Sequence, residues 1–111
     1  MNHSNIDKLS DVVDIIVNKV NPDKIILFGS RARGDFRDDS DYDLLVLKDN
    51  RGKRRFAAEI HSEFCNKGVM IPVDILVADT EKYSNRLSEM GFIYREINKD
   101  GVLIYERDER V

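Results

Sequence analysis

The chain has 111 residues, of which 41% are hydrophobic and 35% are charged, and its formal net charge at pH 7 is −3. This length suits a single domain over residues 1–111, with one core under a well-solvated surface. The acidic balance argues against extended nucleic-acid binding, which normally requires a basic surface. No apolar run approaches the ~20 residues that cross a bilayer, and the lone cysteine suits a reducing compartment, so we expect no membrane association and a cytoplasmic location.

The first part of the chain predicts one helix followed by two strands. Apolar residues recur at steps of three and four over residues 6–20, which is typical of an amphipathic helix that Pro22 then stops. Residues 24–28 form a short run rich in isoleucine, and they predict a buried strand. Residues 42–47 are continuously apolar after an acidic start, so we expect a second strand that is covered on both faces.

The rest of the chain predicts two more helices and two more strands. In order, the expected elements are a turn at 48–53, a helix that starts at 56 and ends near 66–68, a strand at 73–77, a helix over 80–99 interrupted near Gly91, and a strand at 102–105. We expect Cys65 to be a small core residue of its helix. This order predicts an α/β (α+β) fold, in which a small mixed sheet of about four strands has helices packed against it.

Two aspartates, Asp41 and Asp43, stand at the start of the second predicted strand. Because side chains alternate between the faces of a strand, both point one way while Tyr42 points the other. Their Cα atoms lie about 7 Å apart, so their oxygens can bracket a pair of cations about 3.5–4 Å apart. Asp74 starts another strand, where one register would bring it alongside. Carboxylates without nearby His or Cys suit two Mg²⁺ ions, or Mn²⁺, rather than Zn²⁺.

The alternative is that each aspartate is a turn or strand-end residue with a local hydrogen bond. For Asp41 alone, that alternative would be preferred. The alternating pair, together with Asp74 inside an apolar run, favours a metal site. By contrast, the aspartates of the preceding loop lack strand geometry and are expected to be solvated, namely Asp35, Asp38 and Asp39.

The loop after the first predicted strand offers groups that bind phosphate. Gly29 lets the backbone approach a ligand closely, and Ser30 presents a hydroxyl and an amide at an expected helix start. Arg31 and Arg33 add charge-assisted donors, although only one of them needs to face the site. A Gly-Ser pair alone is a weak signal. The pattern Gly-Ser-Arg-x-x-Gly, followed within seven residues by Asp-x-Asp on a strand, is a specific combination.

This combination, together with Val-Asp-Ile-Leu at residues 73–76, resembles the nucleotidyltransferase superfamily related to DNA polymerase beta. The short chain is similar to the minimal nucleotidyltransferase branch, which is typical of prokaryotic antitoxins paired with HEPN-domain toxins. The resemblance covers nearly the whole chain, from the first helix to the apolar run that ends at Tyr105.

By this resemblance the three aspartates are catalytic and bind metal. Asp41 and Asp43 would ligate two divalent ions, whereas Asp74 would bind one of them and accept the proton of an attacking hydroxyl. All three positions are filled, so the sequence shows no departure that marks an inactive member.

The same resemblance assigns the glycine–serine loop to the nucleotide. Gly29 and Ser30 would hold the β- and γ-phosphates of ATP, with Arg33 or Arg31 assisting. We expect no second domain of the kind that larger members use to hold a nucleic-acid acceptor.

The activity implied is a metal-dependent transfer of AMP from ATP to a hydroxyl. The implied acceptor is a tyrosine of a HEPN-domain toxin, so that the chain would be an antitoxin and form a hetero-oligomer with its partner. Two alternatives stay open: transfer to RNA ends or to a small molecule such as an aminoglycoside, and neutralisation of the toxin by binding alone. The sequence identifies no residues that select the base, the acceptor or the number of transfers.

Overall fold

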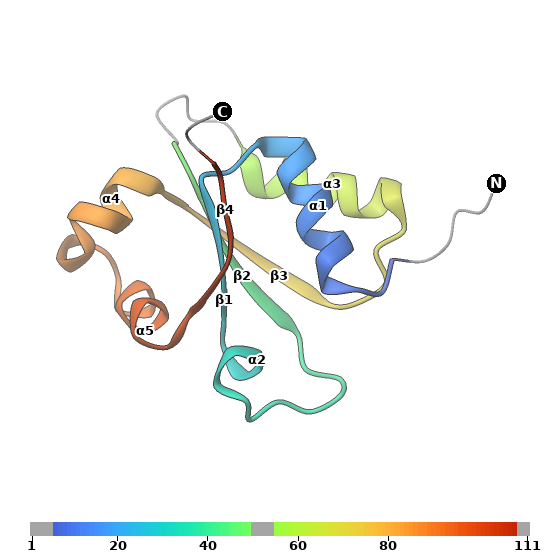
Figure 1. Ribbon diagram of the computed structural model, residues 1–111, viewed down its shortest axis with the longest axis horizontal. Helices are drawn as coiled ribbons and strands as arrows, with labels where there is room; N and C mark the ends of the chain where they lie inside the picture. Colours follow the sequence, from blue (N-terminus) through green and yellow to red (C-terminus); the bar gives the residue numbers. More distant parts are fainter. Residues whose placement is uncertain (1–5, 50–54, 109–111) are drawn as a thin grey trace.

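A four-stranded sheet in the order β3-β2-β1-β4 forms the centre of the computed structural model, which describes residues 6–49 and 55–108 (Figure 1). The strands are β1 (Lys24–Phe28), β2 (Tyr42–Lys48), β3 (Val73–Asp79) and β4 (Val102–Glu106). Strand β1 is antiparallel to both β2 and β4, whereas β2 and β3 are parallel. The predicted fold is confirmed, and every predicted strand begins at the observed residue.

Helices cover both faces of this sheet (Figure 1). On one face lie α1 (Leu9–Val20) and α3 (Phe56–Lys67), and on the other lie α4 (Thr80–Asn85) and α5 (Phe92–Asp100). The single turn α2 (Ser30–Arg33) joins β1 to β2, and a 3-10 turn (Leu87–Glu89) joins α4 to α5. Within the part of the chain that the structure describes, no helix is long and apolar enough to cross a membrane.

The central residues of β2 show why both faces are covered. The four side chains from Leu44 to Leu47 are at most 1% exposed. Leu44 and Val46 pack with the helices α1 and α3, whereas Leu45 and Leu47 pack with α4 and α5, because side chains alternate along a strand. Each such side chain stabilises the fold by roughly 1.5–3 kcal/mol. The continuous apolar run therefore fixes a three-layer arrangement.

Some local predictions differ from the structure. The predicted helix over 6–20 begins only at Leu9, because Ile6 instead forms a parallel bridge with Val69. Cys65 is exposed, so its prediction as a core residue is wrong, whereas its neighbour Phe64 is buried.

The predicted helix over 80–99 is broken over a longer stretch than expected. It consists of two helices, α4 and α5, with residues 86–91 between them. Gly91 is the N-cap residue of α5. The side chain of Asp79 caps α4 by accepting a hydrogen bond of 3.1 Å from the amide of Lys82. The predicted turn at 48–53 falls mostly on residues outside those described.

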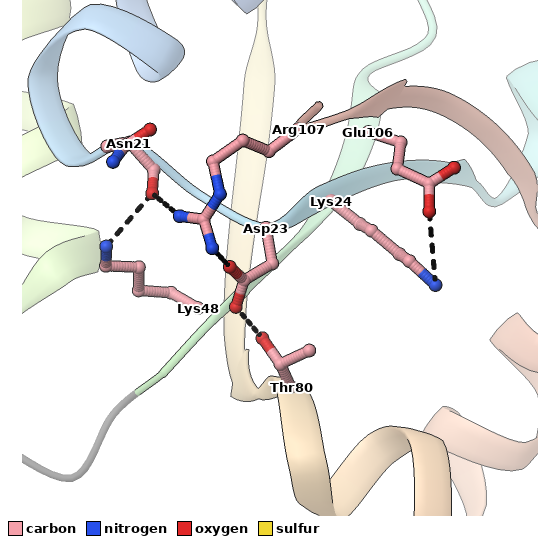
Figure 2. Close-up of polar contacts among 7 residues, drawn as sticks. All are labelled: Asn21, Asp23, Lys24, Lys48, Thr80, Glu106 and Arg107. Carbon is pink, nitrogen blue, oxygen red and sulfur yellow. Dashed lines mark hydrogen bonds and ion pairs between the residues drawn. The ribbon is translucent and has the colours of Figure 1, made fainter. Parts of the chain in front are cut away.

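A polar network joins the strands at the end of the sheet opposite α2 (Figure 2). Asp23, just before β1, forms an ion pair with Arg107, just after β4. Asp23 also accepts a hydrogen bond of 2.5 Å from the hydroxyl of Thr80 at the start of α4. The backbone carbonyl of Asn21 accepts hydrogen bonds from both Arg107 and Lys48. The Asp23 side chain is only 16% exposed, so these partners replace much of its contact with water.

We predict that Arg107→Ala lowers the free energy of unfolding by about 1–3 kcal/mol, because it leaves a shielded carboxylate with fewer partners. Lys24→Ala is the matched control, since Lys24 pairs with Glu106 at 3.9 Å on an exposed surface. That pair should contribute no more than about 1 kcal/mol. Urea denaturation measures both variants, and equal losses would contradict this reading of the network.

Candidate active site

Three aspartates meet at the end of the sheet where α2 begins. Asp43 lies directly beside Asp74 in the parallel register of β2 and β3. The carboxyl of Asp74 lies within hydrogen-bonding reach of both Asp41 and Asp43. Leu45, which by alternation shares a face with Asp43, packs with α4 and α5, so the carboxyls lie on that side of the sheet. The structure therefore brings together the three aspartates that the sequence singles out.

The pKa values of Asp41 and Asp43 are raised. Partial burial, followed by the negative charges of Asp74 and Asp41, raises the pKa of Asp43, and the guanidinium of Arg33 partly offsets this. Reduced hydration, followed by the charges of Asp74 and Asp39, raises the pKa of Asp41. At neutral pH the cluster therefore places unfavourable negative charge on the fold unless a cation compensates it.

The aspartates fit a divalent cation that is shared with a ligand. Their donors are carboxylate oxygens, which hard cations such as Mg²⁺ prefer. No three His, Cys, Asp or Glu side chains among residues 6–49 and 55–108 form a ready-made metal cage. Mg²⁺ is usually held by one or two carboxylates together with waters and substrate phosphates, so an open group of carboxylates suits it.

Gly29 brings the start of α2 against Asp43. Its φ is +76°, a backbone conformation that favours glycine, and a Cβ there would lie 2.2 Å from Oδ2 of Asp43. The helix starts at Ser30, and the amides of Ala32 and Arg33 donate to the carbonyl of Gly29. The backbone at Gly29 and Ser30 therefore lies beside the carboxylate of Asp43, where a phosphate can be bound.

The guanidinium of Arg31 is committed to the loop that follows α2. It lies over the ring of Phe36 and over that of Tyr42, 4.5 and 4.3 Å from their centroids. It also donates hydrogen bonds to the carbonyls of Ser40, at 3.0 Å, and Asp38, at 3.1 Å. This role of Arg31 was not predicted from the sequence, although the two aromatic residues that follow it, Phe36 and Tyr42, were a signal for it.

Arg33 lies near the aspartates. Its positive charge opposes the rise in the pKa of Asp43. Its Nε atom is 3.4 Å from Oδ2 of Asp35, but both side chains are well exposed, so this pair holds the arginine only weakly. Of the two arginines of the loop, Arg33 is therefore the better placed to turn towards a phosphate.

We predict that Asp43→Asn raises the melting temperature at pH 7 without divalent cations. Because folding raises the pKa of Asp43, this carboxyl stabilises the folded state fully below the ordinary Asp pKa of 3.8. That stabilisation is lost as the pH rises through the pKa of the folded state. The amide removes that loss, so the gain should shrink as the pH falls from 7 towards 3.8. Thermal melts in a chelator test this, with the exposed Asp38→Asn as control. A gain that is independent of pH would contradict it.

We also predict that Gly29→Ala destabilises the fold more than Gly34→Ala. Gly34 is in the left-handed helical region, where alanine should cost about 1–2 kcal/mol. Gly29, with φ +76° and ψ −157°, is in a region that is essentially restricted to glycine, where alanine should cost about 1–3 kcal/mol. Gly34 has nothing within 4 Å of an added Cβ, whereas Gly29 meets the carboxylate of Asp43. That collision should add about 1–3 kcal/mol. Urea denaturation gives the difference, and similar values for both variants would contradict the close approach.

Comparison with known proteins places these observations in a family. A family model described as "Polymerase beta, Nucleotidyltransferase" matches residues 10–110. A search of curated proteins found no match. Among the solved structures that share the fold, two are described below.

The first, a candidate nucleotidyltransferase from Sulfolobus solfataricus, is 23% identical with a TM-score of 0.58, over 89% of this chain and 78% of that chain. The second, a toxin–antitoxin with AMP-PNP, is 17% identical with a TM-score of 0.54, over 99% of this chain and 77% of that chain. Because the family model spans nearly all of the sequence, the chain belongs to the polymerase beta nucleotidyltransferase family.

Proposed function

We propose that the chain is a metal-dependent adenylyltransferase that moves AMP from ATP to a tyrosine hydroxyl of a HEPN-domain toxin, and so acts as an antitoxin. The observation that carries this proposal is the pairing of Asp43 with Asp74, with Asp41 in reach and the turn at Gly29 and Ser30 alongside. The family supplies the reaction class. The likeness to a toxin–antitoxin structure with AMP-PNP, an analogue of ATP, supports the choice of nucleotide and partner.

The turn after β1 holds the phosphates in this mechanism. The backbone at Gly29 can approach the β- and γ-phosphates because no side chain intervenes, and Ser30 donates from its amide and hydroxyl. Arg33 exchanges its weak pairing with Asp35 for charge-assisted hydrogen bonds to the phosphates. The α-phosphate is thereby directed towards the aspartates.

The aspartates carry out the transfer. Asp74 takes the proton of the tyrosine hydroxyl as its oxygen attacks the α-phosphorus. The new oxygen–phosphorus bond forms as the bond from the α-phosphorus to the bridging oxygen breaks, and pyrophosphate leaves. Asp41 and Asp43 would hold two Mg²⁺ ions, one of them shared with Asp74. When bound, these cations neutralise charge on the leaving pyrophosphate and lower the pKa of the attacking hydroxyl.

Mass spectrometry of the partner protein tests this transfer. After incubation with ATP and Mg²⁺, a HEPN-domain protein encoded by a neighbouring gene should gain the mass of one or more AMP groups. Asp41→Asn should slow the transfer roughly 100-fold or more, whereas the exposed loop variant Asp38→Asn should match the wild type. Transfer that survives in Asp41→Asn would contradict the site.

The same experiment separates the alternatives. A stable complex with no change in the mass of the partner would indicate neutralisation by binding alone. Label from ATP that appears on added RNA or on an aminoglycoside, but not on the protein, would change the acceptor. The net charge of −3 favours a short contact over an extended nucleic-acid footprint.

A further inference from the structure

A cleft of about 300 Å³ lies beside Gly29 on the α5 side of the sheet. Its apolar wall consists of Phe28, Ile93 and Ile97, and its polar lining consists of Arg33, Glu96 and Asp100. This volume is at the lower end of the range for sites that bind small molecules. The cleft shares Gly29 with the turn to which the phosphates are assigned.

The cleft is also next to the aspartates. Its wall residue Phe28 lies opposite Asp43 in the register of β1 and β2, and Phe28 packs with the helices on the same face. Helix α5 ends close to β1, since a Cβ at Gly101 would be 2.6 Å from Cγ2 of Ile26. A ligand anchored at Gly29 can therefore reach both the aspartates and this cleft.

The apolar wall of the cleft includes a side chain that does not belong to the hydrophobic core. The side chain of Ile93 is 50% exposed, although Ile97 one turn later is 2% exposed and belongs to the core. The exposed isoleucine and the partly buried ring of Phe28 both line the cleft. Two apolar surfaces beside a phosphate-binding turn suit a flat ring that is attached to phosphates.

The carboxylates in the lining define which polar groups the cleft accepts. Neither the side chain of Glu96 nor that of Asp100 forms a hydrogen bond or ion pair with another described residue. An ionised carboxylate accepts hydrogen bonds and cannot donate them, and it repels phosphate. These side chains therefore suit hydroxyl or amino groups and direct the phosphates back towards Arg33.

We propose that this cleft is the nucleoside subsite of the enzyme. The base packs against Ile93 and Phe28, and Glu96 accepts a hydrogen bond from a donor of the nucleoside, either a ribose hydroxyl or an exocyclic amino group. This inference rests on the proposed function, because it needs a nucleotide whose phosphates lie at Gly29. It adds the residues that select the nucleoside, which the family motifs do not specify.

Isothermal titration calorimetry in Mg²⁺ tests the apolar wall, with ATP and tripolyphosphate as separate probes. Ile93→Ala should weaken ATP binding about fivefold, because it removes apolar contact area from the base, and should leave tripolyphosphate binding unchanged. Phe92→Ala is the matched control, since Phe92 is the preceding residue, is 67% exposed and does not line the cleft. It should leave binding of both probes unchanged.

The outcomes separate this inference from the function on which it rests. If ATP binding is unchanged in Ile93→Ala, or if tripolyphosphate weakens equally, the subsite is overturned while the phosphate site stands. If the wild type binds neither probe, the proposed function fails and the subsite fails with it.

A second comparison identifies the donor that Glu96 meets. Glu96→Ala should weaken binding of ATP more than of 2′-deoxy-ATP if the donor is the ribose hydroxyl. It should weaken ATP more than an analogue lacking the 6-amino group if the donor is on the base. An identical change for all three nucleotides would overturn the role of Glu96.

Discussion

Repulsion between neighbouring carboxylates is the constraint on which this structure depends. The parallel register of β2 and β3 sets Asp43 beside Asp74, and the resulting negative charge has to be held in place by the rest of the fold. The buried centre of β2 opposes this repulsion, since each fully buried apolar side chain stabilises the fold by roughly 1.5–3 kcal/mol. The Asp23 network ties β1 and β4 together at the far end of the sheet. The aspartate cluster and this network therefore lie at opposite ends of one sheet.

Those parts of the fold that follow from local periodicity could be predicted. The four strands begin where the apolar runs begin. In β2 the apolar run is continuous because its side chains are buried on both faces of the sheet. The pairing of Asp43 with Asp74 does not follow from local periodicity. It depends on which strands are neighbours in the sheet and on whether they run parallel or antiparallel. It could be anticipated only because both aspartates occupy the starts of strands, and parallel strands bring their starts to the same edge.

Features that depend on tertiary contacts could not be predicted in this way. The periodicity of the first helix extends to Ile6, but a bridge to Val69 competes for that backbone and prevails. Cys65 follows a buried phenylalanine on α3 and still points to solvent, because a rotation of about 100° per residue separates adjacent side chains. The two arginines of the loop are only two residues apart in sequence. Their different surroundings arise from aromatic rings that the fold brings over Arg31 and, among residues 6–49 and 55–108, not over Arg33.

The stacking of Arg31 has a thermodynamic consequence for the site as a whole. Its contacts with Phe36, Tyr42 and the carbonyl of Ser40 order the segment between α2 and β2 before any ligand arrives. Fixing the backbone of a free loop costs roughly 1–2 kcal/mol per residue in conformational entropy. Here that cost is met during folding, so a ligand at the proposed site does not have to order the loop. Preorganisation of this kind favours affinity and a fixed ligand geometry.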